Sequence, residues 1–241
     1  MKKRIQWLLQ RVLGFKRYLF YFSLYKIKTL KSDKKEGDFL HFVGLLPKDA
    51  TVLDIGANIG IMAVWLAQSC PKGQVHAFEP IPENFEALKR IVGHFKLSNV
   101  TLHDIALGDE PGAIKMVMPE VQNVKMQGLS HVVHESIPDF NEGNFYEVPV
   151  KTLDSMTEIG PVQGIKIDVE NFEYFVLKGA GHLLERDKPV VYAELWANEN
   201  REKCFEFMRG LGYQVQVLEG KRLLEFDPKR HEHQNFFFVH P

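Results

Sequence analysis

An acidic side chain beside two glycines is the first feature that indicates ligand binding. In "VLDIGANIG" (52–60), Asp54 lies in an apolar run just before Gly56, and Asn58 and Gly60 follow at alternate positions. Glycine permits a sharp turn or close ligand approach, and Asn tolerates the left-handed region. A buried, unpaired carboxylate is unfavourable by several kcal/mol. We therefore expect Asp54 to face a cation, such as the ammonium of an amino-acid ligand.

Two further stations follow along the chain. Glu79 ends the predicted strand 74–80, where an acid commonly accepts hydrogen bonds from the two hydroxyls of a ribose. Asp104 and Ile105 end the next predicted strand and offer a polar edge and an apolar wall to an adenine. An aminocarboxyl group, a ribose and a purine together describe S-adenosylmethionine, which we predict as the cofactor.

A second acidic group offers candidate catalytic residues. Asp168 ends a predicted strand, Glu170 and Glu173 follow at the start of a helix, and Glu194 ends "PVVYAEL". A hydroxyl acceptor must lose its proton during methyl transfer, so Asp168, Glu170 and Glu194 are candidate bases. Helix capping explains Glu170 and Glu173 equally well, and a buried ion pair explains Glu194 equally well.

Histidines offer weaker candidates. His131 and His134 lie in an inserted segment, 119–146, which is long enough to cover a substrate. On a helix the two would share a face, and we include His131 as a candidate base, although such pairs usually have a packing role. "HEH" at 231–233 fits a solvated loop. Asp168, Glu170 and Glu194 together would offer the oxygen ligands of a magnesium or calcium site, but we predict no metal site.

The order of elements predicts an α/β fold. Strand-like and helix-like segments alternate, which indicates a mostly parallel seven-stranded sheet with helices on both faces. The last two strands have no long helix between them, so an antiparallel edge strand is expected. The expected strands are 51–55, 74–80, 100–107, 164–169, 189–195, 213–218 and 235–240, and the expected helices include 61–70, 86–95 and 201–211. We divide the chain into an N-terminal extension, 1–44, and one domain, 45–241.

Six motifs resemble, in order, those of the FkbM-type methyltransferases, which are S-adenosylmethionine-dependent enzymes with the class I Rossmann-like sheet. The motifs are "VLDIGANIG", "HAFEPIPENF", "HDIALGD", "VPVKTLDSM", "IKIDVENFEYFVLKGA" and "NFFFVHP". The resemblance implies O-methylation of a hydroxyl on a sugar, glycan, polyketide or related secondary metabolite. It also implies these cofactor contacts: Asp54, Gly56, Asn58, Gly60, Glu79, Pro80, Asn84, Asp104, Ile105 and Ala106.

One residue departs from that family pattern. The family usually has glycine after the acid of "D-V-E-G", and this chain has Asn171. Asn can adopt the backbone angles of glycine, so we expect the turn to be kept. The missing motif [DN]-P-P-[FYW], which serves amino nitrogens, favours an oxygen acceptor.

The N-terminal segment has a different charge from the rest of the chain. Residues 1–35 hold eleven Lys and Arg against one acid, so 36–241 carries 19 basic and 30 acidic residues, a net charge of 19 − 30 = −11. This acidic body argues against nucleic-acid binding. The basic, aromatic-rich segment predicts either contact with an anionic membrane surface or packing on the body or on a second subunit of a homodimer. We favour packing, because amphipathic faces usually point to a core.

Cys70 and Cys204 show no paired spacing, so we expect a reducing, cytoplasmic setting, peripheral at the inner membrane surface if 1–35 contacts lipid. Two other functions remain open: an NAD-linked oxidoreductase, which Asp54 and the absence of G-x-G-x-x-G oppose, and a non-catalytic methyltransferase-like binding protein.

Overall fold

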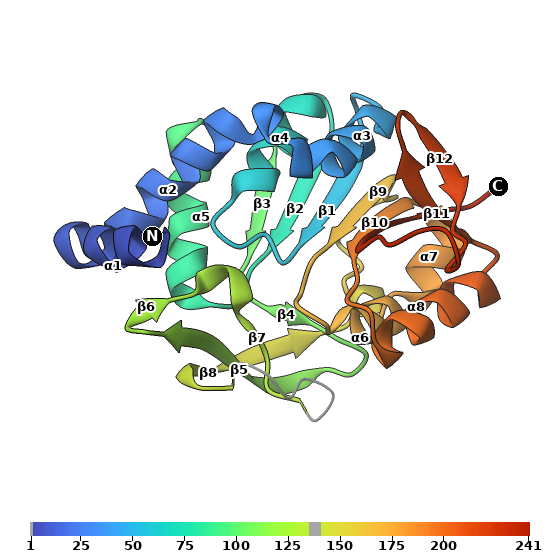
Figure 1. Cartoon of the computed structure of the whole chain (residues 1–241). Helices are drawn as coiled ribbons and strands as arrows, with labels where there is room; N and C mark the ends of the chain where they lie inside the picture. Colours follow the sequence, from blue (N-terminus) through green and yellow to red (C-terminus); the bar gives the residue numbers. More distant parts are fainter. Residues whose placement is uncertain (1, 135–140) are drawn as a thin grey trace.

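A large mixed sheet forms the centre of the molecule (Figure 1). The computed structural model describes residues 2–134 and 141–241. The strands pair in the order β12-β11-β13-β10-β9-β1-β2-β3, with β13, β11 and β12 antiparallel and the others parallel. Their bounds are β1 (Thr51–Ile55), β2 (Gln74–Phe78), β3 (Val100–His103), β9 (Gly164–Ile167), β10 (Val190–Glu194), β11 (Gln214–Glu219), β12 (Arg222–Glu225) and β13 (Asn235–Val239). The predicted α/β class is confirmed. β12 adds an eighth strand, because a tight turn at Gly220, with φ of 64°, folds the chain back on β11.

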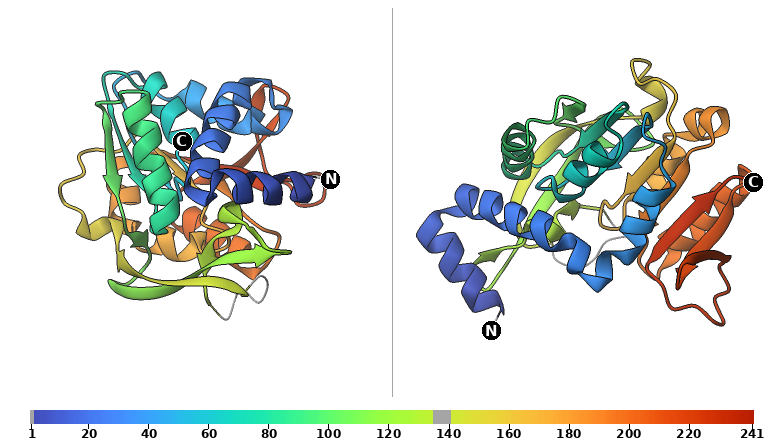
Figure 2. Two further views of the ribbon diagram at one scale, coloured as in Figure 1. Left: turned by 90° about the vertical axis from the view of Figure 1, so that its left-hand side faces the viewer. Right: turned by 90° about the horizontal axis from the view of Figure 1, so that it is seen from above.

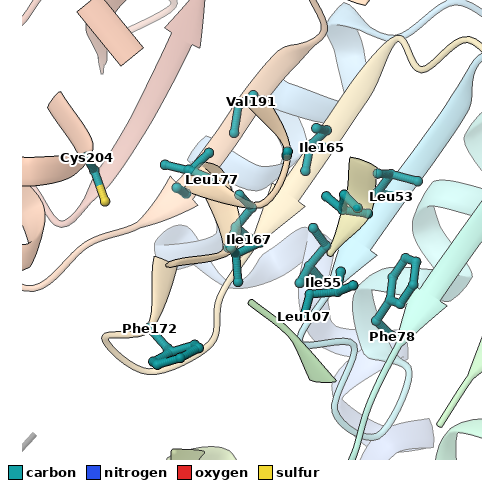
Figure 3. Packing of buried hydrophobic residues seen from close by; sticks show 14 of the residues in the cluster. Leu53, Ile55, Phe78, Leu107, Ile165, Ile167, Phe172, Leu177, Val191 and Cys204 are labelled. Carbon is teal, nitrogen blue, oxygen red and sulfur yellow. The ribbon is translucent and has the colours of Figure 1, made fainter. Parts of the chain in front are cut away.

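Helices cover both faces of this sheet. On one face lie α3 (Gly37–Leu45), α4 (Ile61–Ser69) and α5 (Pro82–His94), and on the other lie α6 (Glu173–Lys178), α7 (Gly181–Asp187) and α8 (Glu199–Gly210). Apart from Asp54 of β1 and Lys166 of β9, the buried side chains of the central strands β1 and β9 are apolar on both faces, as burial between two helical layers requires. Figure 3 shows Ile55, Ile165 and Val191 packed towards Leu177 of α6 and Cys204 of α8. Because β10, β9, β1, β2 and β3 are parallel, they all end at the same side of the sheet. The strand order changes direction at β1, which lies between β9 and β2, and a ligand can enter there.

A second, smaller sheet lies beyond that edge. It contains β4 (Ala106–Leu107), β5 (Gly112–Val121), β6 (Val124–Lys125), β7 (His131–Val132) and β8 (Gly143–Lys151). The third strand, expected within 100–107 and ending at Asp104 and Ile105, is β3; the chain turns at these two residues, and β4 then pairs with β8 in the second sheet, which the sequence did not predict. The segment 119–146 belongs mostly to this sheet, and its residues 135–140 lie outside the described residues. Four short 3-10 turns complete the elements: η1 (Leu30–Ser32), η2 (Lys34–Glu36), η3 (Gln127–Leu129) and η4 (Leu153–Ser155).

The N-terminal segment forms two helices, α1 (Lys2–Leu13) and α2 (Phe15–Thr29). α2 packs on α4 and α5 through Tyr18, Leu19, Ser23 and Ile27, all of which are buried. α1 projects at one edge of the molecule, and β12 and the C-terminus lie at the opposite edge (Figures 1 and 2). No helix among the described residues is long and apolar enough to span a lipid bilayer.

Candidate active site

The loop after β1 is shaped by its close approach to β9. Gly56 has φ of 74°, and a Cβ there would lie 1.8 Å from the carbonyl oxygen of Asp168. Asn58 has φ of 49°, so it does adopt the left-handed region in place of a glycine. Gly60 begins α4 with φ of 83°, and a Cβ there would lie 2.8 Å from Leu88 of α5. Both glycines are thus required by packing within the protein.

Glu79 organises this loop from the end of β2. Its Oε2 accepts a hydrogen bond from the backbone N–H of Asn58 at 2.9 Å, and its Oε1 accepts from the N–H of Ile81 at 2.9 Å and from Asn84 Nδ2 at 3.3 Å. Burial raises the pKa of Glu79 to about 7. The ordinary value for a glutamate is 4.5, so this carboxyl changes its charge near neutral pH.

A cavity, which we call the first cavity, opens beside Glu79. Including its mouth it encloses about 610 Å³. Its walls come from the ends of β1, β2 and β9, from the turn before β4, and from the second sheet. The lining residues are Ile55, Gly56, Asn58, Phe78, Glu79, Pro80, Ile81, Asn84, Ile105, Ala106, Leu107, Met116, Gln127, Gly128, Ser130, Val132, Asp168, Val169, Glu170 and Phe172.

The first cavity suits the nucleoside half of S-adenosylmethionine. Asn58 Oδ1 and Asn84 Oδ1 are buried acceptors with no hydrogen-bond partner among the described residues. Together with the Glu79 carboxylate they offer acceptors to ribose hydroxyls, and Phe78 and Ile105 offer apolar surface to a purine. The donor and acceptor chemistry of the cavity therefore fits the predicted cofactor.

The predicted contact of Asp54 with the ligand is wrong. Asp54 has no exposed surface, and its Oδ1 lies 3.2 Å from Nζ of Lys166, which is also buried. The two residues are register partners in β1 and β9, so their side chains share one face of the sheet. Lys166 also donates a hydrogen bond to the Gly56 carbonyl at 2.8 Å. The cation that balances Asp54 is thus part of the protein.

A second cavity lies on the other side of the Gly56–Asn58 loop. It is lined by Phe22, Lys26, Glu36, Gly56, Ala57, Asn58, Ile59, Ile61, Met62, Gln127, Gly128, Lys166 and Asp168. Lys26 comes from α2 and pairs with Asp33 at 3.0 Å, with Glu36 at 3.9 Å. Residues of both charges and the start of α4 therefore surround this space. Sequence reasoning did not identify Lys26, because its helix precedes every motif.

Acidic side chains gather where the two cavities meet. Asp168 lines both cavities, has 35 % of its side chain exposed, and lies 3.8 Å from Lys166 Nζ. Burial, with the nearby charges of Asp168 and Glu194, raises the pKa of Glu170 to about 9. Burial, with the charge of Asp168, raises the pKa of Glu194 to about 7. The three predicted catalytic acids thus form one electrostatic group, although Glu194 does not line either cavity.

Glu173 holds the loop that carries Asp168 and Glu170. Its Oε1 accepts hydrogen bonds from the N–H groups of Val169 at 3.1 Å and Asn171 at 3.2 Å. Burial raises its pKa to about 8. Asn171 has φ of 76°, the glycine-like angle expected from the sequence. Glu173 therefore has a structural role in this loop, and it does not cap α6, whose N-cap residue is Phe172.

Two other predicted site residues lie elsewhere. His131 is buried in β7, with Nδ1 2.8 Å from the Leu129 carbonyl and Nε2 3.3 Å from Asn141 Oδ1. Both ring nitrogens have protein partners, and because His131 lies in a strand, the helical arrangement that would place it on one face with His134 does not occur. Asp104 is exposed and does not line the first cavity, because the turn after β3 directs Ile105 and Ala106 inward instead.

The acidic side chains were also considered as ligands of a metal ion. Within residues 2–134 and 141–241, no group of three His, Cys, Asp or Glu side chains is arranged to hold a metal ion. In the "HEH" loop, His231 Nδ1 accepts from the Asp227 N–H at 3.0 Å and His233 pairs with Glu219 at 3.0 Å.

The sequence is similar to those of known proteins. A family model described as the methyltransferase FkbM domain matches residues 54–228. Methyltransferase 1 of Beauveria bassiana (strain ARSEF 2860) is 26% identical over 159 residues, which cover 59% of this chain and 63% of that protein. The 31-O-demethyl-FK506 methyltransferase FkbM of Streptomyces tacrolimicus is 37% identical over 76 residues, 32% of this chain and 28% of that protein. The chain thus spans less than two thirds of the length of these relatives.

A solved structure shows the same fold. The crystal structure of methyltransferase FkbM from Methylobacillus flagellatus KT superposes with a TM-score of 0.56 at 17% identity. The match covers 81% of this chain and 45% of that one. At this identity the likeness shows the architecture alone.

Proposed function

The chain belongs to the FkbM methyltransferase family, whose cofactor is S-adenosylmethionine, and from this premise we propose that it methylates a hydroxyl oxygen on a sugar, glycan or secondary metabolite. When bound, the cofactor supplies an electrophilic methyl group on a sulfonium. The protein has to bind the two ends of the cofactor, hold the acceptor in line and receive the hydroxyl proton.

The position of Asp168 is the observation that carries the proposal. Its side chain lines both cavities and is partly exposed, so it lies where the nucleoside and amino-acid ends of the cofactor would meet. That junction is where the sulfur is expected. Asp168 is therefore placed to accept the proton of a hydroxyl that approaches the methyl carbon. Lys166 Nζ lies 3.8 Å from this carboxylate.

The amino-acid end of the cofactor requires groups of both charges. With Asp54 buried against Lys166, the groups that line the second cavity are Lys26, Glu36 and the first turn of α4. We assign the cofactor carboxylate to Lys26 and to the N-terminus of α4, because backbone N–H groups and a helix dipole favour an anion there. The ammonium group then faces Glu36.

Two observations favour oxygen over nitrogen as the acceptor. The motif [DN]-P-P-[FYW], which serves amino nitrogens, does not occur in the sequence. The Streptomyces relative is named for methylation of a 31-O-demethyl compound, which is a hydroxyl acceptor.

The charge of the chain argues against RNA as the acceptor. The net charge of −11 for residues 36–241 makes a polyanionic RNA acceptor unfavourable.

Methyl transfer tests the proposal directly. Purified protein is incubated with methyl-labelled S-adenosylmethionine and a panel of hydroxyl-bearing acceptors, including oligosaccharides, nucleotide sugars and macrolactones, and mass spectrometry locates the label. We expect an O-methyl product and a fall in kcat of about 10²- to 10⁴-fold in Asp168→Asn, the range for loss of a general base. Affinity for S-adenosylhomocysteine should change little.

A matched control separates catalysis from folding. Asp109→Asn removes an acid that pairs with Lys178 at 2.8 Å, outside both cavities, and should keep full turnover. Label on nitrogen, or full turnover in Asp168→Asn, would overturn the assignment.

A further inference from the structure

The first N-terminal helix turns its apolar face outward. Ile5, Leu8, Leu9 and Val12 of α1 follow the i, i+3, i+4, i+7 spacing that places side chains on one helical face. All four are exposed, with Leu8 54% and Val12 72% accessible. On helices of globular proteins this face normally packs against the core. The exposed stripe is therefore the reverse of what packing on the body would produce.

A polar side chain makes the contact between α1 and the body instead. Gln10 Nε2 donates to the Lys125 carbonyl at 3.1 Å, and Gln10 Oε1 accepts from the Lys125 N–H at 3.1 Å. These two bonds fix α1 to β6 with its apolar stripe facing away. Packing of the apolar face on the body, one of the two forms of packing that we expected, is thus found for α2, whereas the apolar face of α1 is exposed.

The neighbouring helix continues the exposed surface. Tyr21 and Tyr25 of α2 are 56% and 62% accessible and lie one turn apart. A groove between the helices is lined by Ile5, Gln6, Leu9 and Leu13 of α1 and by Tyr18, Tyr21, Phe22 and Tyr25 of α2. Seven of the ten exposed large hydrophobic side chains among the described residues lie on these two helices. Large exposed apolar patches of this kind mark interaction sites.

Exposed basic side chains lie on the same two helices and on the turns that follow them. Residues 1–35 contain eleven Lys and Arg, and their one acid, Asp33, already pairs with Lys26. The exposed cations of the two helices and the turns after them are Arg4, Arg11, Lys16, Arg17, Lys28, Lys31, Lys34 and Lys35. Apolar and aromatic side chains among many cations are the composition of a helix that lies in the headgroup region of an anionic membrane.

We propose that α1 and the exposed face of α2 form a docking surface for an anionic lipid membrane. The aliphatic stripe of α1 enters the upper acyl region, Tyr21 and Tyr25 lie at the headgroups, and the cations contact lipid phosphates. Pairing with a second copy is less favourable, since a twofold contact would bring the exposed Lys and Arg side chains of the two copies together. This inference does not depend on the proposed methyl acceptor.

The position of the surface relates it to the active site. Phe22 lines both the groove between α1 and α2 and the second cavity. Lys26, one helical turn further, lines the second cavity as well. A membrane that contacts α1 and α2 would therefore lie next to the end of the cofactor site where we place the amino-acid group.

Vesicle flotation of the full chain tests the proposal. We expect the protein to float with vesicles of phosphatidylcholine and phosphatidylglycerol, and to float poorly with phosphatidylcholine alone or at high salt, which screens exposed charges. Leu8→Glu should weaken vesicle binding at least tenfold. The matched control, Leu224→Glu, replaces another exposed leucine on β12 at the opposite edge and should bind like the unmodified protein.

Two further measurements distinguish the loss of membrane binding from a damaged fold and from a dimer contact. Leu8→Glu should retain its affinity for S-adenosylhomocysteine, which shows that the fold and the cofactor site are intact. The absence of flotation on anionic vesicles, or equal flotation of Leu8→Glu, would overturn the proposal. A dimer in light scattering that Leu8→Glu dissociates, without vesicle binding, would assign the surface to a second copy.

Discussion

Lys166 and Asp54 lie opposite each other in adjacent parallel strands, with 3.2 Å between Nζ and Oδ1 and both side chains buried. The ammonium of Lys166 also donates to the Gly56 carbonyl at 2.8 Å, so one cation joins the end of β1 to the end of β9. Burial alone would lower the pKa of Lys166, but Asp54 and Asp168 raise it, and the net direction is upward. The charged pair thus fixes the loop on which the cofactor site is built.

Removing Lys166 should therefore destabilise the protein strongly. In Lys166→Met the Asp54 carboxylate is left buried without its cation, and we expect the free energy of unfolding to fall by about 3–5 kcal/mol. The double variant Asp54→Asn/Lys166→Met should lose less than the sum of the single variants. Urea unfolding measures all three.

An exposed ion pair provides the control for that experiment. Lys203 pairs with Glu199 at 2.8 Å on the surface of α8, and Lys203→Met should change stability by no more than about 0.5 kcal/mol. Equal urea midpoints for Lys166→Met and the unmodified protein would show that the buried pair is not structural.

The charge state of Glu79 should make cofactor affinity depend on pH. Its pKa is about 7 in the folded protein, and hydrogen bonds from ribose hydroxyls favour the ionised form. Affinity for S-adenosylhomocysteine should therefore rise from pH 6 to pH 8, by at most about tenfold per pH unit. Isothermal titration in buffers of different ionisation enthalpy should detect a released proton.

Variants assign that dependence to Glu79. Glu79→Gln should bind weakly and show a flatter pH profile, while Glu86→Gln, on the exposed face of α5, should match the unmodified protein. Without ligand the sign is opposite. The folded state holds a proton that the unfolded chain has lost between pH 4.5 and 7, so this group's contribution to stability decreases as pH rises through that window. An affinity that falls towards pH 8 would contradict the prediction.

Much of the parallel sheet could be predicted because each strand is a short apolar run that ends in a polar residue or a turn. The break after His103 could not be predicted, since the pairing of β4 with β8 depends on a strand far along the chain. Asp54 was expected to face a cation of the ligand, and it faces Lys166 of the protein instead. A lysine inside the apolar run "GIKIDV" was the available signal, because a cation in a buried strand requires a buried anion.

The assignment of the second cavity to the amino-acid end predicts a selective loss of affinity in Lys26→Met. S-adenosylhomocysteine should bind about ten- to a hundredfold more weakly, which corresponds to one hydrogen bond to a charged group. 5′-Methylthioadenosine, which lacks the amino-acid group, should bind as before. Isothermal titration of both ligands measures the difference.

Lys28 supplies the matched control in the same helix. Lys28→Met removes an exposed lysine that does not line the second cavity, and both affinities should be unchanged. A parallel loss for both ligands in Lys26→Met would indicate a general disturbance of the site and would contradict the assignment.

The side chain of Asn171 makes a structural contact, at the position where the resemblance implies a glycine. Its Oδ1 accepts a hydrogen bond from Asn198 Nδ2 at 2.7 Å, and its carbonyl accepts from Asn200 Nδ2 at 3.0 Å. Asn198 Oδ1 in turn accepts from the Asn200 N–H at 2.9 Å at the start of α8. Asn171→Gly relieves the left-handed backbone, worth about 1 kcal/mol, but removes the bond to Asn198, worth about 1 kcal/mol, so stability should change little.

Asn171→Ala separates these two opposing effects. Both variants lose the side-chain acceptor, but alanine keeps the unfavourable φ of 76°, so we expect Asn171→Ala to be about 1–2 kcal/mol less stable than Asn171→Gly. Because the loop also carries Asp168 and Glu170, the loss in Asn171→Ala should be accompanied by lower methyl transfer, whereas Asn171→Gly should stay close to the unmodified protein. Thermal unfolding and labelled methyl transfer measure the two effects, and equal behaviour of both variants would show that the backbone angle does not position the loop.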